Sequence, residues 1–200
     1  MFSSKTYWEE RYKSGGNSGV GSYSKFAEFK AEFVNAIIEK YSVRSVTEIG
    51  VGDGNQLSTL KVKKYIGIDV SETAIERCKN VFKDDKSKSF YLSKDFVQHE
   101  KSDMSLSMDV IYHLVEDDIF DGYMHDIFDA SSKLICIYAS NTKSPLGEKN
   151  TKHVKHRRFT DWIEKNKPDS RLVCFKKNRY PYNGDYKTTS FSDFYVFTAK

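Results

Sequence analysis

VTEIGVGDGNQLSTLKVKKYIGIDV, residues 46–70, is the stretch that decides the fold of this chain. Apolar runs at 46–49 and 65–70 each predict a buried strand. Between them, glycines at the alternate positions 50, 52 and 54 mark a place where the backbone turns sharply and lets a ligand approach closely. The stretch therefore predicts a strand, a glycine-rich turn, a short helix over 55–61 and a second strand.

Acidic residues accompany this turn. Asp69 ends the second run and lies 69 − 48 = 21 positions after Glu48, about the separation at which a nucleotide-binding βαβ unit presents a carboxylate to a ribose diol. A carboxylate suits that task because it can accept a hydrogen bond from each hydroxyl. Asp53 inside the turn would repel a pyrophosphate but suits a ligand with an ammonium or sulfonium group. The turn therefore differs from the dinucleotide pattern G-x-G-x-x-G.

EIGVGDG at 48–54, followed by GIDVS at 67–71, resembles the cofactor loop and ribose-binding strand end of the class I, Rossmann-like S-adenosylmethionine-dependent methyltransferases. The resemblance implies a doubly wound α/β fold, with a seven-stranded, mostly parallel sheet, an antiparallel last strand and helices on both faces. It also implies S-adenosylmethionine (SAM) as the cofactor. The residues that this motif would supply to the cofactor are Glu48, Gly50, Gly52, Asp53, Gly54, Asn55, Asp69 and Val70.

Length and composition are those of one globular domain, predicted to span residues 1–200. The 200 residues are 38% hydrophobic and 14% aromatic, which excludes a disordered chain. No apolar run is long enough to cross a bilayer and the N-terminus lacks the apolar core of a signal peptide, so we expect a cytoplasmic protein without membrane insertion. The three cysteines form no C-x-x-C pair and are predicted to be buried thiols.

The N-terminal segment, residues 1–25, is predicted to be a lid on a core formed by residues 26–200. KTYWEERYK at 5–13 has the spacing of a short helix, and a glycine-rich loop follows at 14–22. In the resembled family, a W-x-x-R-Y segment of this kind folds over the cofactor. That implies a lid containing Tyr7, Trp8, Arg11 and Tyr12, with Trp8 and Arg11 binding the cofactor and Arg11 pairing with its carboxylate. The alternative is a helix that docks its aromatic residues into the core and leaves Arg11 in solvent.

The remaining periodicity predicts the other elements. Ser71 is expected to cap the helix that follows the second strand. Helices are expected at 26–41, 72–82, 116–133 and from about 159, and strands at 89–93, 104–114, 134–139, 172–175 and 194–198. Asp95 and Phe96 follow the third strand, where the resemblance implies an acid and a ring that flank the adenine; the alternative is a loop acid and a core phenylalanine.

Polar residues at the end of the fourth strand are the predicted catalytic group. Ligands of open α/β sheets bind beyond the carboxyl ends of the strands, which places Asp109, Tyr112 and His113 near the transferred methyl group. Methyl transfer to a hydroxyl needs a base, and histidine suits neutral pH. His113 is the first choice, and His153 or His156 from the long polar stretch after 139 is the second. Each could instead have a structural role.

Asp109, His113, Glu116 and Asp117 lie close together in sequence, but no H-x-x-x-H or H-x-x-E spacing is present, so no metal site is predicted. The local basic cluster KNTKHVKHRR at 149–158 suggests that an acceptor phosphate or carboxylate is held by Arg157 and Arg158, with Lys152 and Lys155 nearby. Tyr112 is predicted to contact the acceptor.

The substrate is expected to be a small molecule or a sugar unit of a nucleotide- or lipid-linked glycan, methylated on oxygen. The chain lacks the D/N-P-P-Y/F/W motif of DNA amino-methyltransferases and the Pro-Cys of 5-methylcytosine enzymes. Two alternatives stay open. One is an RNA-modifying methyltransferase that uses the basic cluster, since a net charge of +4 neither demands nor excludes nucleic acid. The other is a non-catalytic, partner-binding module of the same fold.

Overall fold

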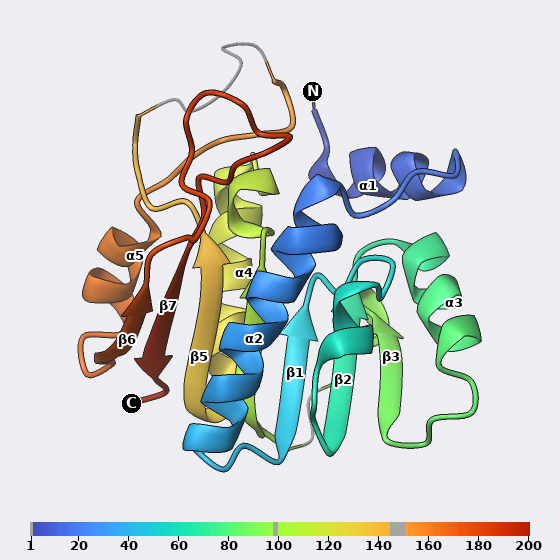
Figure 1. The fold of residues 1–200 in the computed structure, drawn as a ribbon, viewed down its shortest axis with the longest axis horizontal. Coiled ribbons are helices and arrows are strands. Elements are labelled where there is room, and N and C mark those ends of the chain that lie inside the picture. Colours follow the sequence, from blue (N-terminus) through green and yellow to red (C-terminus); the bar gives the residue numbers. More distant parts are fainter. Residues whose placement is uncertain (1, 98–99, 145–150) are drawn as a thin grey trace.

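The computed structural model describes residues 2–97, 100–144 and 151–200. Its centre is a seven-stranded sheet with the order β3-β2-β1-β4-β5-β7-β6 (Figure 1). The strands are β1 (Ser45–Ile49), β2 (Lys64–Asp69), β3 (Lys88–Leu92), β4 (Ser102–Met108), β5 (Ser131–Ala139), β6 (Leu172–Lys176) and β7 (Asp193–Thr198). The helices are α1 (Ser4–Lys13), α2 (Ser24–Lys40), α3 (Glu72–Val81), α4 (Asp117–Asp129) and α5 (Phe159–Asn166).

The strand directions confirm the predicted fold class. Strands β1 to β5 pair in parallel with one another, whereas β7 is antiparallel to both β5 and β6. The carboxyl ends of β1 and β4, adjacent strands from the middle of the sheet, therefore lie side by side at one edge of the sheet, which is where a ligand site is expected.

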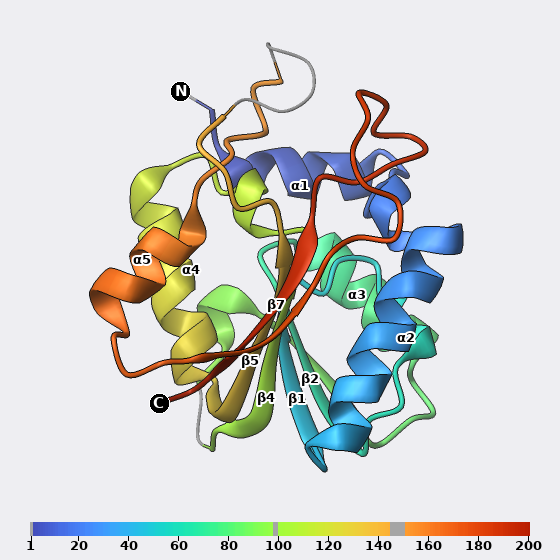
Figure 2. The ribbon, with the colours of Figure 1, turned by 60° about the vertical axis from the view of Figure 1, so that its left-hand side comes forward.

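Helices cover both faces of the sheet, as predicted (Figure 2). On one face, Phe29 and Val34 of α2 pack in the same apolar cluster as Leu106 of β4 and Cys136 of β5, and α3 joins this cluster. On the other face, α4 and α5 pack in a second cluster with alternate residues of β5. Both sides of the central strands are apolar because both are covered, which explains their nearly continuous hydrophobic runs.

Two expectations about helices were wrong. The connection predicted as a helix at 55–61 is a 3₁₀ turn, Gln56–Thr59, because the glycine turn leaves too few residues for a stable α-helix. Helices were also expected between the first six strands, but between β3 and β4 the described residues form only a 3₁₀ turn, Ser93–Asp95. Strand β4 ends at Met108, and the predicted outlet of this strand begins at Asp109, whose φ of +59° leaves the extended conformation.

Cys78 and Cys136 are buried and Cys174 is half-buried, all as free thiols. None of the helices in the described ranges is both long and apolar enough to cross a membrane.

Candidate active site

The glycine turn is built so that only glycine fits it. Gly50, Gly52 and Gly54 have φ values of +90°, +61° and +79°, a region that side chains disfavour. A Cβ on Gly52 would lie 2.3 Å from Ser18 Oγ and 2.9 Å from Tyr12 Oη. The turn is therefore both left-handed and in close contact with the N-terminal segment.

Asp69 is fixed against this turn. Its Oδ2 accepts a hydrogen bond from the Gly52 amide at 2.8 Å, and its Oδ1 accepts one from the Ser71 amide at 2.9 Å. Ser71 also caps α3, as predicted, by accepting from the Ala74 amide. Burial raises the pKa of Asp69, and these backbone donors oppose that rise. The end of β2 thus presents a carboxylate whose position is fixed by the glycine turn after β1 and by the start of α3.

The N-terminal segment lies over the turn. Asp53 accepts hydrogen bonds from the Ser18 amide at 2.8 Å and the Tyr23 hydroxyl at 2.7 Å, so its carboxylate is engaged by the chain itself. Tyr12 is buried, and its hydroxyl is 3.0 Å from Ser18 Oγ. In Figures 1 and 2, α1 crosses above the carboxyl ends of the strands.

Both ends of α1 are fixed to the core. At its start, Ser4 Oγ donates to Glu116 at 2.5 Å, and the Ser4 amide donates to the same carboxylate at 2.8 Å. Further along, Glu9 accepts hydrogen bonds from Ser71 Oγ at 2.6 Å and Thr73 Oγ1 at 2.9 Å, at the start of α3. The helix therefore bridges the β4 outlet and the β2 outlet.

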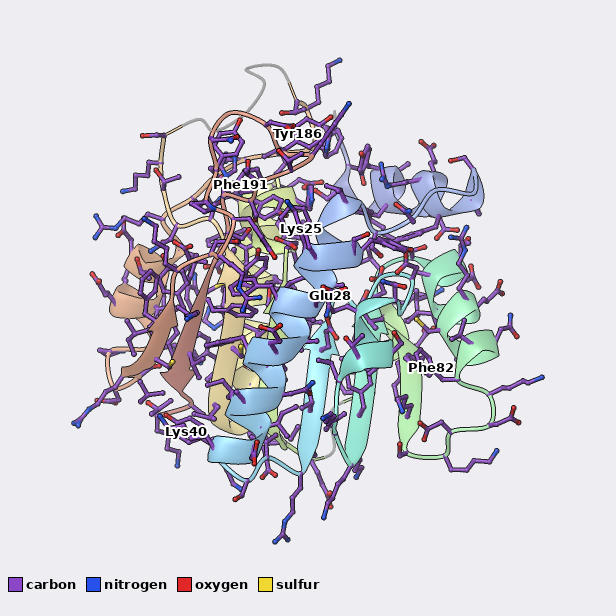
Figure 3. All side chains as sticks on the ribbon, viewed as in Figure 1. Lys25, Glu28, Lys40, Phe82, Tyr186 and Phe191 are labelled. Atoms are coloured by element: carbon purple, nitrogen blue, oxygen red, sulfur yellow. The ribbon has the colours of Figure 1, made fainter. Side chains whose placement is uncertain are left out.

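A cavity of about 520 Å³ opens beside α1 at the carboxyl end of β4. It brings together six of the predicted site residues from three parts of the chain. These are Trp8, Arg11, Asp109, Tyr112, His113 and His153. Its opposite wall includes Tyr186, Lys187 and Phe191 from the β6–β7 loop, which were not predicted; Figure 3 shows Tyr186 and Phe191 above the N-terminal part of α2.

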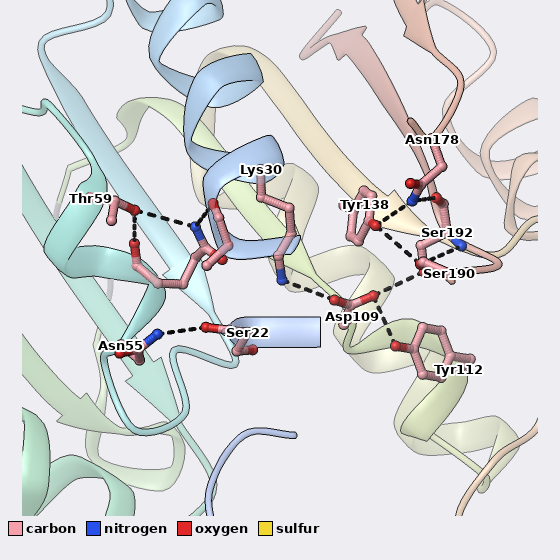
Figure 4. Close-up of polar contacts among 12 residues, drawn as sticks. Ser22, Lys30, Asn55, Thr59, Asp109, Tyr112, Tyr138, Asn178, Ser190 and Ser192 are labelled. Carbon is pink, nitrogen blue, oxygen red and sulfur yellow. Dashed lines mark hydrogen bonds and ion pairs between the residues drawn. The ribbon is translucent and has the colours of Figure 1, made fainter. Parts of the chain in front are cut away.

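Asp109 is the centre of a polar network in this wall (Figure 4). Its Oδ2 forms an ion pair with Lys30 Nζ at 3.0 Å, and its Oδ1 accepts from Tyr112 Oη and Ser192 Oγ, each at 2.9 Å. The side chain of Lys30 is 1% exposed. Sequence reasoning missed Lys30, although its place four residues after Phe26, on the apolar stripe of α2, was a signal.

The network continues to the β6–β7 loop. Asn178 Nδ2 donates to Tyr138 Oη at 2.5 Å and to the Ser192 carbonyl at 2.7 Å, and Tyr138 donates to Ser190 Oγ at 3.1 Å. These contacts hold the loop that carries Phe191 against the end of β5. No residue of this loop had a sequence motif, so only the tertiary fold reveals its part in the site.

His113 has one nitrogen available for chemistry. Its Nδ1 lies 3.0 Å from the His153 carbonyl oxygen, and because a carbonyl only accepts, Nδ1 carries the proton. Nε2 therefore has a lone pair. Burial lowers the pKa of His113 to about 4, and the nearby positive charge of Arg11 contributes to that shift. The ring is thus a neutral imidazole at pH 7, with the Trp8 ring edge-on at 4.9 Å.

The other two histidines have different surroundings. The His153 ring stacks on Tyr7 at 4.6 Å and lies parallel to His113 at 5.6 Å, at the cavity wall. His156 is bonded through Nδ1 to Ser140 Oγ at 2.6 Å, packs against Phe191 and does not line the cavity. The structure therefore brings His153 to the site and leaves His156 behind its wall.

Arg157 and Arg158, predicted to hold the acceptor, do not reach the cavity. Arg157 donates to the carbonyls of Leu114 and Val115 and pairs with Asp117 at 2.8 Å, which braces the β4–α4 connection. Arg158 pairs with Asp161 at 3.1 Å near the start of α5. Both guanidinium groups are occupied by groups of their own chain because the segment folds back on α4 and α5. Lys149 and Asn150 of the same basic cluster lie outside the described residues.

The remaining predicted cofactor residues lie apart from the cavity. Glu48 is buried beneath the turn, where the Tyr65 hydroxyl donates to it and burial raises its pKa to about 7. Asn55 donates to the Ser22 carbonyl at 2.6 Å, and Val70 is half-buried. Asp95 is exposed, and Phe96 packs on Tyr91 at 5.4 Å. Within the described ranges no group of three or more histidine, cysteine or acidic residues could hold a metal.

No protein-family model matches the sequence, and no curated protein sequence matches it. Solved structures do match, and methyltransferases are among those that match over nearly the whole chain, two of them with bound S-adenosylhomocysteine. The chain therefore has the class I methyltransferase fold.

Among these structures, N-methyltransferase NodS from Bradyrhizobium japonicum WM9, in complex with S-adenosylhomocysteine (SAH), has a TM-score of 0.72 at 14% identity and covers 98% of this chain and 97% of its own. The CcbJ methyltransferase from Streptomyces caelestis has a TM-score of 0.67 at 13% identity, with 98% of both chains covered. Magnesium protoporphyrin IX methyltransferase from Synechocystis PCC 6803, with bound SAH, has a TM-score of 0.66 at 11% identity and covers 97% of each chain.

Proposed function

We propose that this protein is a SAM-dependent methyltransferase that methylates a hydroxyl of a small molecule or of a sugar unit of a nucleotide- or lipid-linked glycan. The observation that carries the proposal is the position of His113. A neutral imidazole, whose Nε2 has no hydrogen-bond partner within the described ranges, lines the cavity at the carboxyl end of β4. Structures of the same fold contain SAH or SAM, which supports SAM as the cofactor.

The residues around the turn suit this cofactor chemically. The Asp69 carboxylate matches a ribose diol, and the Arg11 guanidinium matches the carboxylate of the amino-acid part. When bound, the cofactor supplies an electrophilic methyl group on a sulfonium. In the present conformation Asp69 is only 7% exposed, and Tyr12 and Ser18 cover Gly52. We therefore infer that α1 and the loop at 14–22 move aside to admit the cofactor and then close again.

Proton removal is assigned to His113 and not to Asp109. The Asp109 carboxylate already accepts from Lys30, Tyr112 and Ser192, so it holds those groups in place. His113 Nε2 has no hydrogen-bond partner within the described part of the chain, and His113 lines the cavity that would receive the acceptor. Holding the acceptor oxygen near the methyl carbon provides the remaining rate enhancement, because the reaction is an in-line displacement.

Two alternative hypotheses are weaker. An RNA substrate would use the basic cluster, but Lys155 pairs with Asp117 and Arg158 with Asp161, which offsets part of its charge. A non-catalytic module would have no need for a histidine with a free lone pair in the cavity. The experiment below discriminates among the three.

The first test is calorimetric titration of SAM and SAH into the wild type, Asp69→Ala and the control Asp84→Ala, a substitution in the loop that follows α3. We expect both ligands to bind, and Asp69→Ala to weaken binding at least about tenfold because two hydrogen bonds to a charged acceptor are lost. Circular dichroism checks that the variant is folded. Absence of binding to the wild type would overturn the proposal.

Turnover tests the base. SAH release with a panel of hydroxylated small molecules, nucleotide sugars and RNA identifies the acceptor class. His113→Asn should lower kcat by about 10²–10⁴-fold while SAH affinity stays unchanged, because general-base catalysis is worth that much. An unchanged kcat would exclude His113 as the base.

A further inference from the structure

Features of the cavity indicate the chemical class of the methyl acceptor. The inference drawn from them rests on the proposed function. We propose that the methyl acceptor is a phenol, bound beside His113 as its phenolate anion. Three independent observations support this: the shape of the walls, the distribution of charge, and the weakness of the base.

The walls are aromatic on both sides. Eight of the nineteen residues that line the cavity carry rings. On the α1 side, the rings of Tyr7 and His153 stack with an angle of 10° between their planes, and the Trp8 ring is edge-on to His113. On the other side, Phe191 stands edge-on to Tyr112 at 4.9 Å. A flat ring between such walls gains both burial and ring–ring contacts.

The charge in the cavity is positive. Asp109 is the single acidic residue among the described residues that line it, and Lys30 of α2 offsets that charge through the ion pair at 3.0 Å. Arg11 from α1 and Lys187 from the β6–β7 loop line the same cavity, and neither has a salt-bridge partner within the described ranges. Asp185, which does not line the cavity, interacts with both Lys187 and Lys25, so two lysines share one carboxylate there. A cavity whose described lining carries more cations than carboxylates favours an anionic ligand.

The pKa values of the two histidines in the cavity wall are lowered. Burial, followed by the positive charge of Arg11, lowers the pKa of His153, and the pKa of His113 falls to about 4. Both rings are neutral at pH 7, and the remaining titratable groups in the walls are the hydroxyls of Tyr7, Tyr112 and Tyr186. Burial, the larger cause, disfavours any charged group and also raises the pKa of Tyr112 in the same wall. The positive charge of Arg11 acts in the other direction on an oxyanion, because the two charges have opposite signs.

A weak base is matched to an acidic hydroxyl. A phenol, with a pKa near that of tyrosine at about 10, can lose its proton to His113 or to solvent in a positive cavity, whereas an aliphatic or sugar hydroxyl is far less acidic. The phenolate oxygen then forms the new O–C bond, and the C–S bond of the sulfonium breaks with its electron pair remaining on sulfur. The products are the aryl methyl ether, SAH and the released proton.

The probe is 4-nitrophenol, whose anion is coloured, so its ionisation in the cavity is read directly from absorbance. The pH titration is done with SAH-saturated protein and compared with free 4-nitrophenol. We expect the bound phenol to ionise about one pH unit lower than the free one, which corresponds to a tenfold stabilisation of the anion. Lys187→Met should remove part of that shift. The matched control is Lys83→Met, an exposed lysine beyond the end of α3, which should leave the shift unchanged.

The outcomes separate the two proposals. Suppose that SAH binds but that 4-nitrophenol does not bind, or that bound 4-nitrophenol ionises at the same pH as free 4-nitrophenol. The phenolate proposal then fails and the methyltransferase proposal stands. If SAH does not bind, the proposed function fails. His113→Asn provides a second test. In this variant the bound 4-nitrophenol should still ionise at a lower pH than free 4-nitrophenol, while methyl transfer slows. Benzyl alcohol, of similar size but weakly acidic, should not be methylated; turnover equal to that of phenols would overturn the inference.

Discussion

At the scale of single residues, Asp109 combines an unfavourable backbone conformation with a buried ion pair. A φ of +59° is uncommon for a residue other than glycine, and aspartate tolerates it better than most. The conformation turns the carboxylate toward Lys30, whose side chain is 1% exposed. Breaking a buried pair costs more than the pair contributes, because the remaining charge is left without a partner.

We therefore expect Asp109→Asn to lower the free energy of unfolding by about 3–5 kcal/mol, measured by urea denaturation. Asparagine has the same shape and also adopts positive φ, so the substitution mainly removes the charge. In a double-mutant cycle, adding Lys30→Met should recover part of the loss. Additive effects of the two substitutions would show that the ion pair does not couple them.

The low pKa of His113 predicts an acid-dependent loss of stability. The folded-state pKa of about 4 lies below the unfolded value of about 6.5, so the unfolded chain takes up the proton first as the pH falls. Stability is therefore full above about pH 6.5 and declines toward about pH 4. We expect the wild type to lose roughly 2–3 kcal/mol more than His113→Asn between pH 7 and pH 4.5. His125→Asn, an exposed histidine on α4, should behave like the wild type, and equal losses in all three proteins would contradict the prediction.

At the scale of elements, the contact of α1 with α3 combines a carboxylate of α1, Glu9, with a guanidinium of α3, Arg77. Burial raises the pKa of Glu9, but hydrogen bonds from Ser71, Thr73 and Lys13 lower it to about 2. Arg77 of α3 reinforces the contact by donating to the Gly16 carbonyl at 2.7 Å. Helix α1 is thus held against α3 by polar contacts, and Tyr12 is its buried aromatic residue.

We expect Glu9→Gln to loosen α1 without unfolding the core. Amide hydrogen exchange in residues 4–13 should accelerate at least about tenfold, because charge-assisted hydrogen bonds of about 1.5–3 kcal/mol are weakened. SAH should also associate faster if opening of this helix limits entry. Glu10→Gln is the matched control, since Glu10 is exposed on the same helix. Unchanged exchange in α1 would show that Glu9 does not hold the lid.

At the scale of the whole molecule, the arrangement of strands positions the site. Because β1 and β4 are adjacent and parallel, the glycine turn and Asp109 lie at the same edge of the sheet. The antiparallel β7 lets the β6–β7 loop return to that edge, where Ser192 contacts Asp109. Residues more than eighty positions apart in sequence thus line one cavity.

The sequence by itself determined the strands, the main helices, the glycine turn and the acid at the end of β2, because periodicity, positive-φ glycines and a helix cap are local properties. It also predicted that Asp109, Tyr112 and His113 lie together at the end of β4, since the end of a buried strand can be recognised from the change to polar residues. Only the tertiary structure decided which distant residues meet there: Lys30 opposite Asp109, the β6–β7 loop in the wall, and Arg157 turned to its own backbone. Such pairings depend on how helices and loops pack across the sheet, which no local pattern encodes.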